Sequence, residues 1–175
     1  MNDPFLQVTR VSDEPSGMSN AIISALQHNK TYRPGTGDPL RPRFRSALAN
    51  IMRQESQVYL QAVSDDQHCA VIRTISDSLS QSFSDGLIGG RFRYGTAQKA
   101  LNLYLKFLWR LGRIPTPPHC PVDRIVLKKG GIDAMWTKSD SEAEYRRWIE
   151  TLRRKARPLS LADWEYQVWP RGAGY

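Results

Sequence analysis

The helical pattern from Ala97 to Leu111 constrains the fold of this chain more than any other feature of its sequence. Leucines recur there at intervals of three or four residues, which would place them along one side of a helix. Gly112 follows, as is common where a helix ends. The opposite side would carry four polar residues, namely Lys99, Asn102, Lys106 and Arg110. The pattern predicts an amphipathic helix with its leucines in a core and its polar side facing water.

Further helices are expected on both sides of this segment. They are predicted at residues 17–28, 44–59, 71–83, 123–129, 142–157 and 161–169. Asp123 and Ser160 stand at the N-cap positions of two of them. In the stretch 142–157, the side chains expected to face inward are Tyr145, Trp148, Ile149 and Leu152. Strand patterns, in which apolar and polar residues alternate, are rare. The sequence therefore predicts an all-α fold with a single compact helical domain over residues 1–175.

Three segments are expected to lie outside the helices. Residues 1–15 are predicted to form a loose N-terminal arm, and residues 31–43 a surface loop, because prolines and glycines are dense in the latter. Residues 113–121 form a connection that its prolines stiffen. Helical spacing is also interrupted by Gly86, Gly89 and Gly90.

The charge of the chain favours a polyanionic partner. Lysine and arginine together number 25 against 17 acidic residues, which gives a formal net charge of +8. Such residues release counterions when they bind the phosphates of nucleic acid. No apolar run approaches the roughly 20 residues that span a bilayer, and the first residues show no secretory signal. The two cysteines, Cys69 and Cys120, make no metal-binding set. We expect a cytoplasmic, monomeric protein without membrane association, metal or cofactor.

The stretch 95–126 holds the residues that suggest a chemical reaction. Gly95 would open a helix, Lys99 would lie in its first turn, and Asp123 follows the proline-rich connection. Exposed amides at a helix N-terminus can hold a phosphate. A lysine amine can attack a carbon atom, and a carboxylate can stabilise positive charge that develops in a transition state. These groups suit cleavage of an N-glycosidic bond, in which the sugar acquires oxocarbenium character.

The same stretch resembles the helix-hairpin-helix DNA glycosylase superfamily, the group that contains endonuclease III and the oxidised-purine glycosylases. The pattern of that family is G-V-G-x-K-x-x-N followed by P-V-D-x-x-V. The matching residues here are Gly95, Lys99, Asn102, Pro121, Val122, Asp123 and Val126. Ala97 stands where the family has its second glycine, and the interval from Lys99 to Asp123 is a few residues longer than in the family. The resemblance covers about the second half of the chain and implies a helix-hairpin-helix element.

By this resemblance the protein is a DNA glycosylase that flips a damaged or modified base out of double-stranded DNA and excises it. Lys99 takes the nucleophile position, which would add strand-nicking lyase activity, and Asp123 takes the position of the essential carboxylate. The residues implied in DNA contact are Arg93, Gly95, Thr96, Ala97 and Asn102. The candidates for a base pocket are Phe92, Trp109, His119, Cys120, Trp164 and Trp169. DNA repair and the excision of a hypermodified phage base in antiviral defence both fit this reading.

Simpler roles are open for the same residues. Lys99 can belong to a solvated helix face, Asp123 can serve only as a helix cap, and the aromatic residues can fill the core. Two other functions are also open: a non-catalytic DNA-binding helical module, and a subunit of a toxin–antitoxin or defence complex that binds an acidic partner. A polar pocket beside Lys99 and Asp123 would favour the enzyme, whereas a filled apolar gap would favour the binding module.

Overall fold

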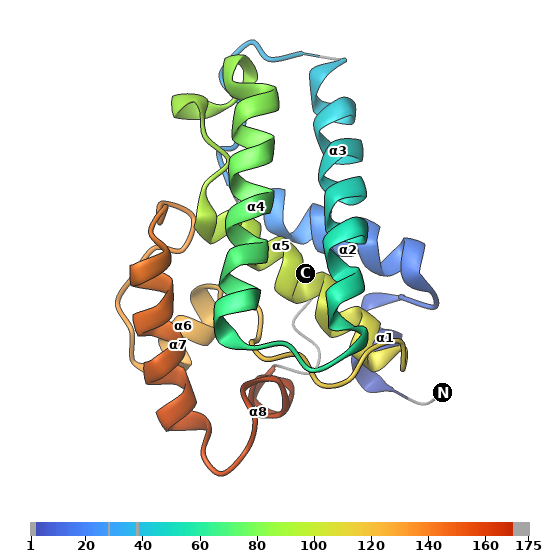
Figure 1. Ribbon diagram of the computed structural model, residues 1–175, viewed down its shortest axis with the longest axis vertical. Coiled ribbons are helices and arrows are strands. Elements are labelled where there is room, and N and C mark those ends of the chain that lie inside the picture. Colours follow the sequence, from blue (N-terminus) through green and yellow to red (C-terminus); the bar gives the residue numbers. More distant parts are fainter. Residues whose placement is uncertain (1–2, 28, 38, 170–175) are drawn as a thin grey trace.

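The computed structural model describes residues 3–27, 29–37 and 39–169, which form an all-α structure as predicted (Figure 1). Its α-helices are α1 (Pro4–Thr9), α2 (Glu14–Leu26), α3 (Leu40–Glu55), α4 (Asp65–Phe83), α5 (Tyr94–Arg110), α6 (Arg124–Gly130), α7 (Glu142–Ala156) and α8 (Leu161–Val168). Short 3-10 helices follow α3 and α4; they are η1 (Ser56–Leu60), η2 (Ser84–Gly86) and η3 (Ile88–Gly90). Within the described ranges, β pairing is limited to one isolated bridge between Tyr32 and Leu87.

Helix α5 runs through the middle of the molecule (Figure 1). Helix α2 packs along α5, and α4 also contacts α5. Helix α3 lies against α4, and α7 packs against both α6 and α8. Every residue of α5 from Tyr94 to Leu108 is buried. One hydrophobic cluster includes side chains from each of the helices α1 to α8. Among the described residues, no helix combines the length and the apolarity that a membrane span requires.

Local signals set where several helices begin and end. Asp123 Oδ1 accepts hydrogen bonds from two amides in the first turn of α6, and Ser160 Oγ accepts one from the amide of Asp163 in α8, so both predicted N-caps are confirmed. A cap of this kind contributes about 1 kcal/mol. Gly112, with a φ of 71°, takes the left-handed conformation just after α5. The predicted inward face of α7 is also confirmed, since its buried residues include Tyr145, Trp148, Ile149 and Leu152.

The prediction of a loose arm at residues 1–15 is wrong for the residues that the structure describes. Helix α1 begins at Pro4, capped by Asp3, and α2 already begins at Glu14. The ring of Phe5 is buried and stacks on Phe107 of α5, with 4.9 Å between ring centroids. The apolar residues of this segment are therefore part of the core. Residues 1–2 of the predicted arm lie outside the described residues.

The predicted loop at 31–43 ends earlier than expected, because α3 begins at Leu40. Pro42 occupies the third position of that helix, where the amide that proline lacks has no partner inside the helix. Within the same segment, Asp38 lies outside the described residues. The predicted helix at 17–28 is observed as α2, which begins three residues earlier and ends at Leu26, and His28 lies outside the described residues.

Candidate functional site

The polar side of α5 is buried, which contradicts the prediction that it faces water. Lys99, Asn102 and Lys106 are all almost completely enclosed. Segments from both ends of the chain cover this side of the helix and supply polar partners for it. Burial of the two lysines and of the Asn102 side-chain nitrogen is tolerated because each has a polar partner within the protein.

Three cations of α5 form ion pairs with carboxylates from distant segments. The distances from the lysine Nζ atoms to the nearest carboxylate oxygens are 2.6 and 2.7 Å. The pairs, called here the α5 ion pairs, are Lys99–Asp123, Lys106–Glu165 and Arg110–Asp3. Buried pairs of this kind add little net stability, but removing one partner leaves an uncompensated buried charge and is strongly destabilising.

The fold thus brings together Lys99 and Asp123, the two residues that the resemblance places at a reaction centre. Asp123 uses both carboxylate oxygens, since Oδ1 caps α6 while Oδ2 contacts Lys99 Nζ. Burial alone would raise the pKa of Asp123, but the Lys99 ammonium and the two α6 amides outweigh it and hold the pKa below its usual value. The side chain of Asp123 is 14% exposed and that of Lys99 is 4% exposed. The carboxylate is therefore the more accessible member of the pair.

Gln98 positions the segment that carries Asp123, a role that the sequence analysis did not identify. Its Nε2 donates to the carbonyl of Val122 at 2.6 Å, and its Oε1 accepts from the amide of Val122 at 3.2 Å. These two hydrogen bonds hold the backbone just before Asp123 against α5. The amide of Asn102 also donates to Gln98 Oε1, at 3.1 Å. The available signal in the sequence was the spacing of Gln98 and Asn102, two amide side chains four residues apart on one helix.

The amides at the start of α5 have acceptors within the protein. The amide of Gly95 donates to the carbonyl of Ser139 at 3.0 Å, and the amides of Thr96 and Ala97 both donate to the carbonyl of Arg93. Gly95 lies inside the first turn of the helix, and a Cβ atom there would stand 1.9 Å from the carbonyl oxygen of Trp136. The absence of a side chain at Gly95 thus permits close contact with the segment before α7. A phosphate would have to displace that segment to reach these amides.

His119 belongs to a buried polar network next to the Asp123 segment. Its Nδ1 lies 2.9 Å from the hydroxyl oxygen of Tyr145, which also accepts from Asn102 Nδ2, and its Nε2 lies 3.1 Å from Asp65 Oδ1. The ring of His68 lies beside it, with 4.4 Å between centroids. Burial lowers the pKa of His119 although Asp65 opposes the shift, and burial also lowers the pKa of His68. Asp65 and His68 were not predicted, because only the fold brings α4 to this segment.

The other base-pocket candidates pack against different neighbours within or against the single hydrophobic core. Phe92 packs on Phe44 of α3, with 5.1 Å between ring centroids. Trp169 meets the edge of Phe5, and Trp109 contacts Tyr166 of α8. Trp164 and Cys120 are also buried, and burial raises the pKa of the Cys120 thiol. These contacts match the core-packing alternative for the aromatic residues.

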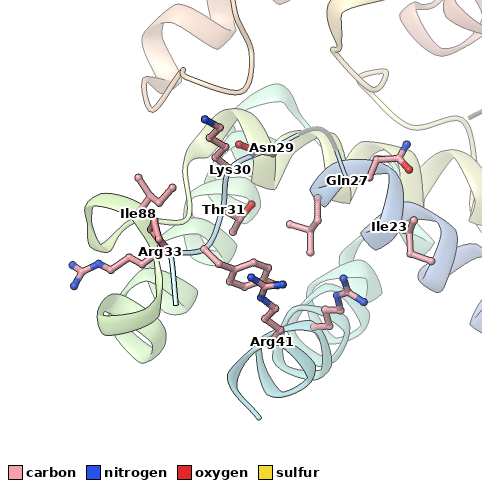
Figure 2. A pocket seen from close by; sticks show the side chains of 12 residues that line it. Ile23, Gln27, Asn29, Lys30, Thr31, Arg33, Arg41 and Ile88 are labelled. Atoms are coloured by element: carbon pink, nitrogen blue, oxygen red, sulfur yellow. The ribbon is translucent and has the colours of Figure 1, made fainter. Parts of the chain in front are cut away.

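Two hollows in the surface lie near the α2–α3 connection. The larger has a volume of about 480 Å³ and is formed by the end of α2, residues 29–34 and the start of α3 (Figure 2). The smaller one adjoins it and reaches Arg93 and Thr96 at the start of α5. Lys99 and Asp123 line neither of these hollows.

Comparisons with protein-family models, with curated proteins and with solved structures found no match to this chain.

Proposed function

We propose that this protein binds double-stranded DNA and removes a damaged or modified base by cleaving its N-glycosidic bond, with Lys99 and Asp123 as the reacting pair. The observation that supports this proposal is the 2.6 Å contact between Lys99 Nζ and Asp123 Oδ2. Both residues match the pattern of one DNA glycosylase superfamily, and they are 24 positions apart in the chain. Residues this far apart in the sequence come into contact only through the tertiary fold, which a short motif does not specify.

Asp123 is suited to stabilise the cationic transition state. Its lowered pKa keeps the carboxylate charged at neutral pH, so that it would face an oxocarbenium sugar as an anion. The same group would orient a water molecule that attacks C1′ of the sugar. In the alternative route the Lys99 amine attacks C1′, the base departs, and the resulting Schiff base leads to strand cleavage. Since Asp123 is the more exposed of the two groups, we favour hydrolysis directed by the carboxylate.

A second candidate is a DNA-binding module without chemistry, and two observations favour it. The Lys99–Asp123 pair lines neither of the two surface hollows, and the first amides of α5 already have acceptors. In this case the ion pair serves only to join α5 to α6. The two candidates differ in whether the carboxylate of Asp123 meets a substrate.

A base-excision assay separates the two candidates. The protein is incubated with duplexes that each carry one modified base, and alkali then cleaves the abasic sites that excision leaves. The informative variant is Asp123→Asn, and the matched control is Glu165→Gln, which removes the carboxylate partner of the other α5 lysine. The enzyme proposal expects excision by the control and excision slowed by about two to four orders of magnitude in Asp123→Asn. DNA binding without excision of any base in the panel would leave the binding module as the function.

A further inference from the structure

The larger hollow, called here the basic pocket, is rich in positive charge (Figure 2). Among the described residues that line it, every charged side chain is a cation. These cations are Lys30, Arg33, Arg41 and Arg45. They come from the α2–α3 connection and the first turns of α3, so they converge from two segments on one concave surface.

None of these four cations takes part in an ion pair with a described residue. Elsewhere at the surface, arginines form ion pairs with carboxylates, as Arg73 does with Glu142 and Arg91 does with Asp77. The guanidinium of Arg33 donates from Nε to the carbonyl of Leu87 at 2.9 Å, which fixes it at the pocket wall. Four like charges that have no carboxylate partner among the described residues repel one another, and an anionic ligand would relieve that repulsion.

One hydroxyl group beside these cations also lacks a partner within the described residues. Thr31 lines the basic pocket and is only 6% exposed, yet its Oγ1 atom has no hydrogen bond there (Figure 2). Buried polar groups in folded proteins are nearly always satisfied. A ligand with acceptor oxygens that reaches Oγ1 would supply the missing partner. The neighbouring hydroxyl of Tyr32 interacts with Arg45, and the guanidinium of Arg41 lies 5.2 Å from the centroid of the Tyr32 ring.

The pocket continues toward the start of α5. The smaller hollow shares Lys30 and Thr31 with it and extends to Arg91 and Arg93. Asn29 contacts the hydroxyl of Thr96 at this point, which ties the α2–α3 connection to α5. The two hollows therefore connect the basic pocket to Arg93 and Thr96, which the sequence resemblance implies in DNA contact, whereas Arg91 between them is paired with Asp77 and Asp140.

We propose that the basic pocket binds a phosphate monoester of a nucleotide, as found at the 5′-end of a DNA strand or on a free nucleotide. A monoester carries a charge of about −2 at neutral pH, whereas each phosphodiester carries only one. Four converging cations and the hydroxyl of Thr31 match this dianion, and the pocket volume of about 480 Å³ admits a whole nucleotide unit. The proposal rests on the proposed function only in taking nucleic acid as the ligand.

The test compares two duplexes that differ only in a 5′-phosphate or a 5′-hydroxyl, each labelled with fluorescein at a 3′-end. Fluorescence anisotropy at low salt should show about tenfold tighter binding of the phosphorylated duplex. The double variant Arg41→Gln/Arg45→Gln should lose this preference. The control Arg147→Gln/Arg154→Gln changes two exposed arginines of α7 and lowers the net charge by the same amount, so it should keep the preference.

Equal binding of the two duplexes by the unaltered protein would overturn the proposal, as would an equal loss of preference in the α7 control. Competition with a nucleoside 5′-monophosphate and with inorganic phosphate identifies which molecule supplies the phosphate that the basic pocket binds. Displacement by the mononucleotide shows that one nucleotide suffices, and displacement by a phosphorylated strand alone assigns the site to strand ends. Excision is measured on 5′-hydroxyl duplexes with the same variants. A phosphate preference without excision refutes only the glycosylase proposal, whereas excision without a preference refutes only the phosphate site.

Discussion

The cations of α5 and those of the basic pocket illustrate two opposite ways in which one basic chain places its charge. Along α5 the three ion pairs neutralise each cation inside the protein. In the basic pocket, four cations stand together without a carboxylate among the described residues that line it. The formal charge of +8 does not distinguish these cases. Positive residues within the helix bundle hold the fold together, and the unpaired ones at its surface are those available to an external anion.

The largest expected effect tests whether one α5 ion pair does more than hold the fold. Asp123→Asn should slow base excision by about two to four orders of magnitude, because it removes the anion that would face the cationic sugar. Asn can still cap α6, although Lys99 loses its counter-charge. Excision rate and denaturant unfolding are to be measured on the same preparation. A folded variant with unchanged excision would reduce the pair to a structural role.

The Lys106–Glu165 pair tests how much the free energy of unfolding falls when a buried charge loses its partner. Glu165→Gln is expected to lower the free energy of unfolding by about 3 kcal/mol, because Lys106 is enclosed and burial already lowers its pKa. Replacing both residues, as in Lys106→Met/Glu165→Leu, should restore most of that loss. Urea denaturation measures both variants. Equal stability of the single and double variants would show that the buried charge is not the cause.

The free energy of unfolding should also depend on pH, because two buried histidines are hard to protonate in the folded protein. Burial lowers the pKa of His68 and of His119 below the ordinary value of 6.5, so the unfolded chain binds more protons than the folded one as pH falls. The free energy of unfolding should therefore rise with pH between about 5 and 7, by up to about 1.4 kcal/mol per pH unit for each histidine. Urea denaturation at several pH values checks this. His119→Gln should flatten the dependence, and an unchanged slope in that variant would contradict the assignment.

The smallest expected effect concerns the basic pocket. Thr31→Val replaces a buried hydroxyl that lacks a hydrogen bond by a methyl group of similar size, so the free energy of unfolding should rise by about 1 kcal/mol. The same variant should bind the 5′-phosphorylated duplex less tightly. Thermal unfolding and anisotropy measure the two properties. A variant that is less stable than the original would mean that the hydroxyl has a partner in solution.

The parts of the fold that were predictable are those set by neighbouring residues. The caps Asp123 and Ser160 act on amides within three positions, and the inward face of α7 follows from its own spacing. The segment Asp3-Pro4 also carried a signal that the prediction of a loose arm did not use, since an aspartate followed by proline often begins a helix.

What could not be predicted depends on distant partners. A polar stripe on a helix usually faces water, and nothing near Lys106 in the sequence shows that Glu165 covers it. The contact of Lys99 with Asp123 was implied only by a resemblance. Gln98 was not identified, and Tyr145 was expected only to face inward, without its hydrogen bonds to Asn102 and His119. The basic pocket was equally hidden, because two of its cations, Arg33 and Arg41, lie in the stretch predicted as a surface loop and the other two lie on either side of it.

The α5 ion pairs also have a consequence for how the chain is made. The carboxylates that neutralise this central helix lie at residues 3, 123 and 165, so its three ion pairs can all form only after the chain has been synthesised as far as α8. A nascent chain that ends before residue 165 holds Lys106 without its partner, and a compact N-terminal half would bury that ammonium at high cost. We therefore expect forms truncated shortly after α7 to stay unfolded and be degraded, and the addition of α8 to allow the preceding helices to reach their native packing.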